Sequence, residues 1–174
     1  MENPTAAGKS CGTCNLCCEI YEIEELAKPM HALCVHARAG DGCAIHGLHP
    51  KTCRSFRCLW LMRPELDDLW LPAVAGFVLR EEGSSLYVDV DRDRKGAWRR
   101  APYYAQIKSW SEVIKTGVGT VFVEDHGVYV VFPEREIFLG RPPRGALVEA
   151  GYAQGKTSRR PWARIVGASD TRAA

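Results

Sequence analysis

Apolar residues recur at three- and four-residue steps over residues 16–28, with glutamates between them. This period predicts a helix that Pro29 ends. The same spacing predicts a second short helix that begins near Pro50 and a third over residues 103–115, which Gly117 ends. These segments are the expected helical part of the chain.

Runs rich in β-branched and aromatic residues predict four strands, at residues 75–80, 86–90, 120–124 and 128–132. Short polar turns separate the first two strands and the last two, so each pair is expected to form a hairpin. The predicted fold class is therefore α+β. We expect a small helical and loop module centred on a metal, followed by a mixed strand–helix–strand body.

Four regions follow from this pattern. Residues 1–10 are small and polar and predict a flexible N-terminus, and residues 11–62 form a cysteine-rich module. A polar, proline-marked link then leads into an α/β body over residues 63–140. Residues 141–174 form a basic C-terminal tail.

Charge and hydropathy argue against nucleic acid and membrane as partners. The formal net charge of the 174-residue chain is only +2, which implies no particular partner. The tail 141–174 carries seven basic and two acidic residues, and we expect a solvated, partly disordered end that binds no nucleic acid. No apolar run approaches the roughly 18 residues that span a bilayer. The N-terminus has no apolar signal core, so the expected location is the cytoplasm.

All the cysteines of the chain lie in one third of it. They are Cys11, Cys14, Cys17, Cys18, Cys34, Cys43, Cys53 and Cys58. A reducing cytoplasm argues against structural disulfides and favours a metal as the partner of these thiols. The eight cysteines are therefore the predicted metal ligands, enough for two four-thiolate sites or for one site with cysteines to spare.

The spacing of the first cysteines favours an iron–sulfur cluster slightly over zinc. Cys11, Cys14 and Cys17 follow the pattern C-x-x-C-x-x-C, with which bacterial ferredoxins hold a [4Fe–4S] cluster, whereas zinc sites use the C-x-x-C pair alone more often. Neighbouring residues on a helix point about 100° apart, so Cys17 and Cys18 are expected to serve different centres. Both the cluster and zinc remain open at this point.

Histidines and arginines accompany the cysteines. His46 follows Cys43 in a C-x-x-H pair and is the best candidate for a mixed ligand, although eight cysteines already fill two sites. Lys51, Arg54 and Arg57 lie beside Cys53 and Cys58. Arg54 is the favoured residue to offset the negative charge of a thiolate centre, and exposed charges on a helix are the equal alternative for all three.

The cysteine pattern resembles a known family. The run from Cys11 to Cys18, the single Cys34, the step Gly42-Cys43 and the closing Pro50-x-x-Cys53-Arg54-x-Phe56-x-Cys58 resemble the YkgJ-type cysteine-cluster family, described as a zinc- or iron-chelating domain. The resemblance covers about residues 11–60 and implies metal chelation by all eight cysteines. The flagellin lysine methylases are similar in this cluster, and there an iron–sulfur centre is implied.

Three functions follow from these patterns. The first is a metal-chelating protein that binds zinc or an iron–sulfur cluster, and the second is an iron–sulfur enzyme of methyl or electron transfer. The third is a thiol redox sensor that releases metal on oxidation. Residues 70–174 contain no phosphate-binding loop, dinucleotide fingerprint or nucleophile elbow. Neither a protein partner nor catalytic residues follow from the sequence.

Overall fold

The chain divides into two compact units. The structure, a computed structural model, describes residues 5–154 and 159–167. The first unit comprises Met1–Glu81 and Val88–Trp98, and the second comprises Glu82–Tyr87 and Arg99–Ala174. This division differs from the ranges predicted from the sequence, because the β3–β4 hairpin contributes to both units.

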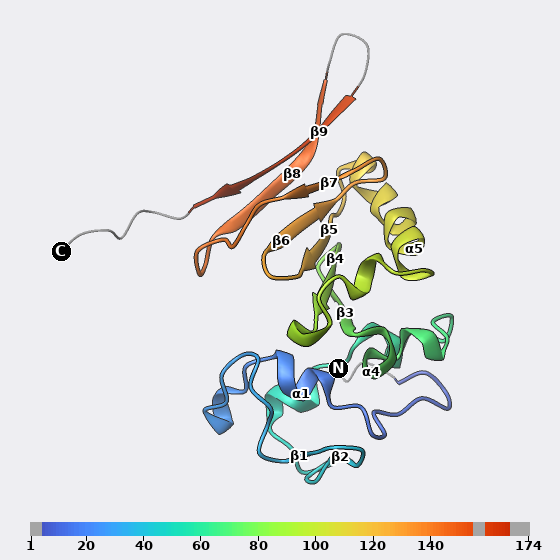
Figure 1. Cartoon of the computed structure of the whole chain (residues 1–174), viewed down its shortest axis with the longest axis vertical. Coiled ribbons are helices and arrows are strands. Elements are labelled where there is room, and N and C mark those ends of the chain that lie inside the picture. The colour runs from blue at the N-terminus through green and yellow to red at the C-terminus, as the bar shows by residue number, and fades with distance from the viewer. Residues whose placement is uncertain (1–4, 155–158, 168–174) are drawn as a thin grey trace, which may run out of the picture. The chain divides into compact units, whose positions relative to one another are not determined.

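The predicted α+β fold class is confirmed. The strands of the main sheet follow chain order, β3-β4-β5-β6-β7, and short helices precede and interrupt them (Figure 1). Two smaller two-stranded sheets, β1-β2 and β8-β9, complete the strands of the described residues.

The first unit consists of short elements. They are α1 (Leu16–Ile20), η1 (Glu24–Leu26), β1 (Ala37–Arg38), β2 (Gly42–Cys43), α2 (Lys51–Ser55), α3 (Leu59–Met62), η2 (Asp68–Trp70), α4 (Pro72–Ala75), β3 (Phe77–Glu82), β4 (Ser85–Val90), η3 (Arg92–Arg94) and η4 (Ala97–Arg99), of which β3, β4 and η4 cross the unit boundary. Pro72 starts α4 with a preset φ, and Gly76, at φ 83°, ends it in the left-handed region. The chain then enters β3 with the buried residues Phe77 and Val78.

The helix predicted over residues 16–28 is wrong beyond its first turn. α1 ends at Ile20, and the backbone of Tyr21 is extended. The chain then reverses, because Ala27 takes a left-handed conformation and Ile23 pairs with Lys28 in an isolated bridge. This reversal brings the Lys28 ammonium group back to the carbonyls at the end of α1, so the long-range packing of Lys28 replaces a continuous helix.

The second unit contains the longer elements. They are α5 (Tyr103–Trp110), η5 (Ser111–Thr116), β5 (Val121–Glu124), β6 (Val128–Val131), β7 (Glu136–Phe138), β8 (Leu147–Gln154) and β9 (Arg159–Val166). α5 and η5 together confirm the helix predicted over residues 103–115, and Gly117 ends it at φ 71°. β5 and β6 form the predicted hairpin, with Val121 opposite Val131.

The expectation of a solvated tail is wrong for most of residues 141–167. β8 and β9 pair antiparallel over eight positions, from Leu147 opposite Val166 to Gln154 opposite Arg159. Val148, Ala150 and Tyr152 alternate along β8 and pack on a buried cluster of Ile114, Phe122, Val130 and Phe132. Burial of this alternating face fixes the ribbon, on the opposite side of β5–β7 from α5 (Figure 1). The rest of the predicted tail, residues 155–158 and 168–174, lies outside the described residues.

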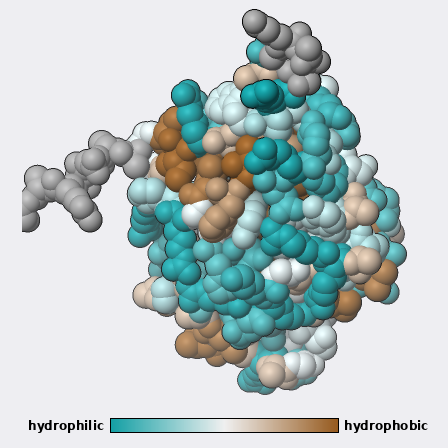
Figure 2. All heavy atoms as spheres, turned by 45° about the horizontal axis from the view of Figure 1, so that its top comes forward, coloured by the Kyte–Doolittle hydropathy of each residue, from teal (hydrophilic) through white to brown (hydrophobic). Residues whose placement is uncertain are grey.

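Apolar residues also remain on the surface. Leu147 and Phe138 of the second unit are exposed by more than half. The face in Figure 2 is mostly hydrophilic, with apolar residues gathered in a few patches. Within the described residues, every helix is too short or too polar to cross a bilayer.

Candidate metal centre

The first cysteines lie on a tight loop that leads into α1. The backbone N–H of Cys14 donates to the carbonyl oxygen of Cys11 at 2.9 Å, which closes the C-x-x-C turn. Leu16 and Ile20, four residues apart, are buried and anchor α1. Cys17 and Cys18 lie between these two anchors, so the packing of one short helix positions both thiols.

Cys34 and Cys43 lie on the segment that returns past α1. The N–H of Cys34 donates to the carbonyl of Cys18 at 3.1 Å. The β1–β2 hairpin then places Cys43 opposite Ala37. At the neighbouring position, Gly42 packs so closely against the Cys11–Cys14 loop that an added Cβ would lie 2.2 Å from the carbonyl oxygen of Gly12. Backbone contacts therefore bring this hairpin to the first cysteines.

Cys53 and Cys58 belong to two separate helices. Cys53 lies in α2, which ends where Phe56 becomes extended, and Cys58 precedes α3 with an extended backbone. The backbone between the two thiols leaves the helical conformation, so they are not constrained to one helical register. The Glu25 carboxylate accepts hydrogen bonds from both the N–H and the hydroxyl group of Thr52, which holds α2 to η1.

These segments bring all eight cysteines around one cavity of the first unit. The cavity has a volume of about 500 Å³. Every cysteine is a free thiol; Cys34 and Cys58 are buried and the other six are half-buried. The set is Cys11, Cys14, Cys17, Cys18, Cys34, Cys43, Cys53 and Cys58. Apolar side chains, among them Ile23, Phe56 and Trp60, complete the wall. Free thiols thus converge on one cavity from distant parts of the sequence.

Four of these thiols have a raised pKa and hold their protons in the absence of metal. Burial raises the pKa of Cys11 and Cys53, and raises the pKa of Cys58 to about 11. The adjacent thiols Cys17 and Cys18 differ, because a hydrogen bond between them leaves the proton on Cys17. This bond raises the pKa of Cys17 and lowers the pKa of Cys18 to about 7. Cys18 is therefore the thiol best prepared to act as a thiolate.

Lys28 supplies a buried positive charge behind these thiols. Its side chain is 6 % exposed, and its ammonium group donates to the carbonyls of Glu19 and Pro29 at 3.0 Å and also to the carbonyl of Tyr21. Burial lowers the pKa of Lys28, and negative charge on Cys34 and Cys18 counteracts this. A buried cation held mainly by carbonyl dipoles gains most when neighbouring thiols ionise.

The basic residue expected beside the thiols is a different one. Arg54, favoured from the sequence, is exposed and does not line the cavity. Arg57 lines it instead, and its positive charge lowers the pKa of Cys11 against the larger effect of burial. α2 ends between these two arginines, so they do not lie on one helical face.

Three histidines also line the cavity, namely His36, His46 and His49. The rings of His46 and His49 stack at 5.1 Å between centroids. The Nδ1 atom of His49 accepts the N–H of Gly47 at 3.0 Å, which leaves Nε2 as its protonated nitrogen. The geometry permits a role for His46 near the thiols, and its role as a ligand stays a prediction.

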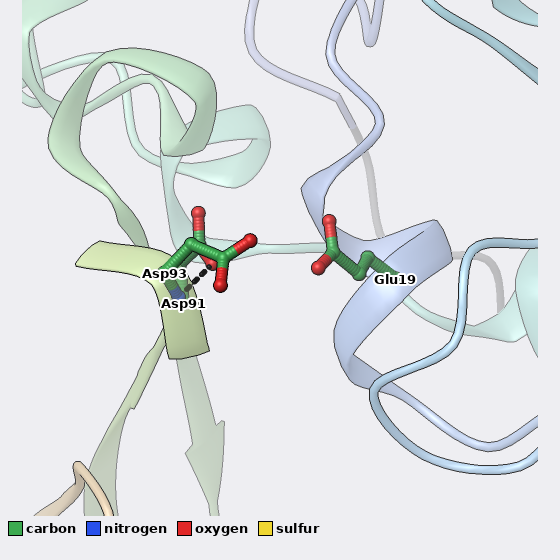
Figure 3. Close-up of side chains that lie close together, drawn as sticks. All are labelled: Glu19, Asp91 and Asp93. Carbon is green, nitrogen blue, oxygen red and sulfur yellow. Dashed lines mark hydrogen bonds between the residues drawn. The ribbon is translucent and has the colours of Figure 1, made fainter. Parts of the chain in front are cut away.

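One other group of donors in the first unit could hold a metal ion. Glu19, on α1, points toward Asp91 and Asp93 (Figure 3), and one carboxylate oxygen from each lies within 4.8 Å of the others. The Asp91 carboxylate also accepts the N–H of Asp93 and the guanidinium of Arg94, both at 2.9 Å. Across residues 5–154 and 159–167, this acidic group is the one set of three potential ligand residues whose donor atoms all lie within 4.8 Å of one another. No three of the thiol sulfurs in this part of the chain lie that close together, so they are spread more widely around their cavity.

Sequence reasoning missed Lys28 and the acidic group. Lys28 looked like the last exposed residue of a long helix, and no local pattern indicates that the chain turns back there. Glu19 is far in sequence from Asp91 and Asp93, so only the fold brings them together.

Comparison of the chain with protein-family models, with curated proteins and with solved structures finds no match.

Proposed function

We propose that the protein binds an iron–sulfur cluster through the cysteines of its first unit. The observation that carries this proposal is the convergence of eight free thiols on one cavity. Eight thiols gathered around one cavity suit a metal centre, because thiolates bind soft metals strongly. Lys28 and Arg57 add positive charge that favours a negatively charged thiolate centre.

The spacing of the sulfurs favours a cluster over a single zinc ion. Two thiolates on one tetrahedral zinc, each about 2.3 Å from the metal, lie about 3.8 Å apart. In the described part of the chain no three thiol sulfurs lie within 4.8 Å of one another. A cluster binds its cysteines through separate iron atoms and so accepts a wider arrangement around a larger cavity. The C-x-x-C-x-x-C loop supports the same choice.

The resemblance to the YkgJ-type cysteine-cluster family forms part of this proposal. The resemblance implies that all eight cysteines are ligands, and the proposal adopts that assignment. We also propose a cytoplasmic location, since its reducing environment keeps such thiols available for metal.

Anaerobic purification followed by metal analysis tests the proposal. We expect a brown protein that absorbs near 400 nm and contains iron and acid-labile sulfide in about equal amounts. A colourless protein with stoichiometric zinc would show that the ligand is zinc and not an iron–sulfur cluster. A metal-free protein whose eight thiols all react with a thiol reagent after reconstitution with iron and sulfide would refute chelation altogether.

A further inference from the structure

We propose that the eight cysteines form two separate four-thiolate centres. The first consists of Cys11, Cys14, Cys17 and Cys58, and the second consists of Cys18, Cys34, Cys43 and Cys53. This partition rests on the proposed function and adds the assignment of each thiol to a centre.

Backbone contacts assemble the first set. The turn from Cys11 to Cys14 leads directly into α1, where Cys17 follows Leu16. The segment before this turn is held against the segment after Cys58. The N–H of Ala6 donates to the carbonyl of Leu61 at 2.7 Å.

Lys9 strengthens this junction. Its ammonium group donates to the carbonyl of Arg63 at 2.7 Å and lies 4.9 Å from the centroid of the Trp60 ring. Lys9 is two residues before Cys11, and Trp60 is two residues after Cys58. The junction therefore brings Cys58 to the N-terminal loop as its distant fourth thiol.

Other contacts assemble the second set. The N–H of Cys34 donates to the carbonyl of Cys18, and the carbonyl of Cys34 accepts from Ala37, which lies opposite Cys43. Cys53 follows Thr52, whose bonds to Glu25 hold α2 on the reversed segment that ends in Lys28. All four thiols thus depend on the part of the chain that turns back after α1.

The charges that act on Cys58 and Cys53 agree with this division, whereas Cys11 is acted on by thiols of both sets, namely Cys14, Cys18 and Cys43. After burial, the charges that act most on Cys58 are those of Cys11 and Cys14. Those that act most on Cys53 are Cys18, Cys34 and Cys43. Cys17 and Cys18 are joined by their hydrogen bond and stand at the boundary between the two sets.

Cations act on thiols of both sets. Arg57 acts on Cys11 of the first set. Lys28 interacts most with Cys34 and Cys18 of the second set and less with Cys17 of the first. Two thiolate centres would each carry a net negative charge, which these cations would offset.

Paired substitutions test the partition. Two variants remove two thiols from one set: Cys11→Ser with Cys58→Ser, and Cys34→Ser with Cys53→Ser. Two matched controls remove the same four thiols across the sets: Cys11→Ser with Cys34→Ser, and Cys58→Ser with Cys53→Ser. Iron, sulfide and zinc per chain are measured after anaerobic purification, together with the spin count of the reduced protein by electron paramagnetic resonance.

We expect the same-set variants to keep about half of the wild-type metal and the cross-set controls to lose nearly all of it. Equal losses from same-set and cross-set variants would overturn the partition. If a double variant does not fold by circular dichroism, the single variants Cys58→Ser and Cys53→Ser replace it. Each should keep about half of the metal, and complete loss from either would overturn the partition. Failure of the proposed function is distinguishable, because the wild-type protein would then hold no iron and no acid-labile sulfide.

Discussion

Gly42 and Gly12 are in backbone contact, and an added Cβ at Gly42 would lie 2.2 Å from the carbonyl oxygen of Gly12. Gly42 belongs to the β1–β2 hairpin beside Cys43, and Gly12 belongs to the Cys11–Cys14 turn. The absence of a side chain at one position therefore determines how closely two cysteine-bearing segments approach.

Substitution of Gly42 by alanine is expected to separate these segments. Both the left-handed conformation of Gly42, at φ 78°, and the clash with a rigid backbone oppose a side chain. The conformation costs about 1 kcal/mol and the clash adds about 1–3 kcal/mol. Hydrogen exchange of residues 11–43 and metal content after purification measure the effect.

Gly40→Ala is the matched control for this substitution. Gly40 lies in the same hairpin at φ 76°, and an added Cβ meets nothing within 4 Å. The Gly40→Ala variant should lose only the stability that the left-handed conformation costs, and it should keep its metal. Equal destabilisation of the two variants would mean that the contact with Gly12 does not matter.

The metal-free protein should contain one thiol that reacts unusually fast at neutral pH. The hydrogen bond from Cys17, assisted by Lys28, lowers the pKa of Cys18 to about 7, so about half of Cys18 is thiolate at pH 7. Cys17→Ala removes the donor and Lys28→Met removes the cation, and each should raise this pKa. Alkylation rates against pH, assigned by peptide mass mapping, report the shift.

Lys51→Met serves as the control for charge, because Lys51 is exposed on α2. The pKa of Cys18 should rise more in Cys17→Ala than in Lys28→Met, since the hydrogen bond from Cys17 lowers it more than the charge of Lys28 does. An unchanged pH profile of Cys18 in both test variants would show that neither contact controls this thiol.

Arg80 should stabilise the first unit much more than an exposed arginine does. Its Nε atom lies 2.7 Å from the Asp89 carboxylate, which is 3 % exposed and also accepts the hydroxyl group of Tyr21 at 2.5 Å. Arg80→Met leaves a buried carboxylate without its paired guanidinium, at a cost of about 3–5 kcal/mol at pH 7. Urea denaturation measures the free energy of unfolding.

The effect of Arg80→Met should depend on pH. Burial raises the pKa of Asp89 in the folded protein above its value of 3.8 in the unfolded chain, and loss of Arg80 raises it further. The folded state therefore gains protons as pH falls, so the destabilisation should shrink toward pH 4 and be greatest above the folded pKa. Arg63→Met, whose partner Glu81 is exposed, should cost less than about 1 kcal/mol at any pH. A loss from Arg80→Met as small as that control would contradict the prediction.

The C-terminal ribbon should be a structural part of the second unit. The Tyr152 ring meets Phe132 edge-on at 5.4 Å, and its hydroxyl group donates to Glu134 at 2.8 Å. Tyr152→Ala should destabilise the unit by about 1–3 kcal/mol because it exposes the buried cluster beneath β8. Thermal unfolding compares it with Leu147→Ala, which removes a side chain that is 67 % exposed and should cost no more than about 0.5 kcal/mol. Equal effects would mean that β8 does not cover the core.

The sequence alone determined the fold class, the helix at residues 103–115 and the hairpin of β5 and β6, because local periodicity and turn residues specify these elements. It also identified the eight thiols, since spacing and residue type are visible without a fold. Tertiary structure decided the path of the backbone and the contacts that connect these elements and thiols. The reversal at Ala27 and the burial of Lys28 depend on a bridge to Ile23 and on carbonyls up to nine residues away. The approach of Gly42 to Gly12 joins two segments that are distant in sequence.

The tail shows the same limit in the second unit. Residues 147–154 and 159–166 have a net positive charge, which favoured a solvated end, yet Val148, Ala150 and Tyr152 find a buried cluster made by other elements. A two-stranded ribbon gains little from its own contacts and forms because a sheet is present to cover. The sequence therefore determined which residues could bind metal or pack, and only the assembled chain decided which of them meet.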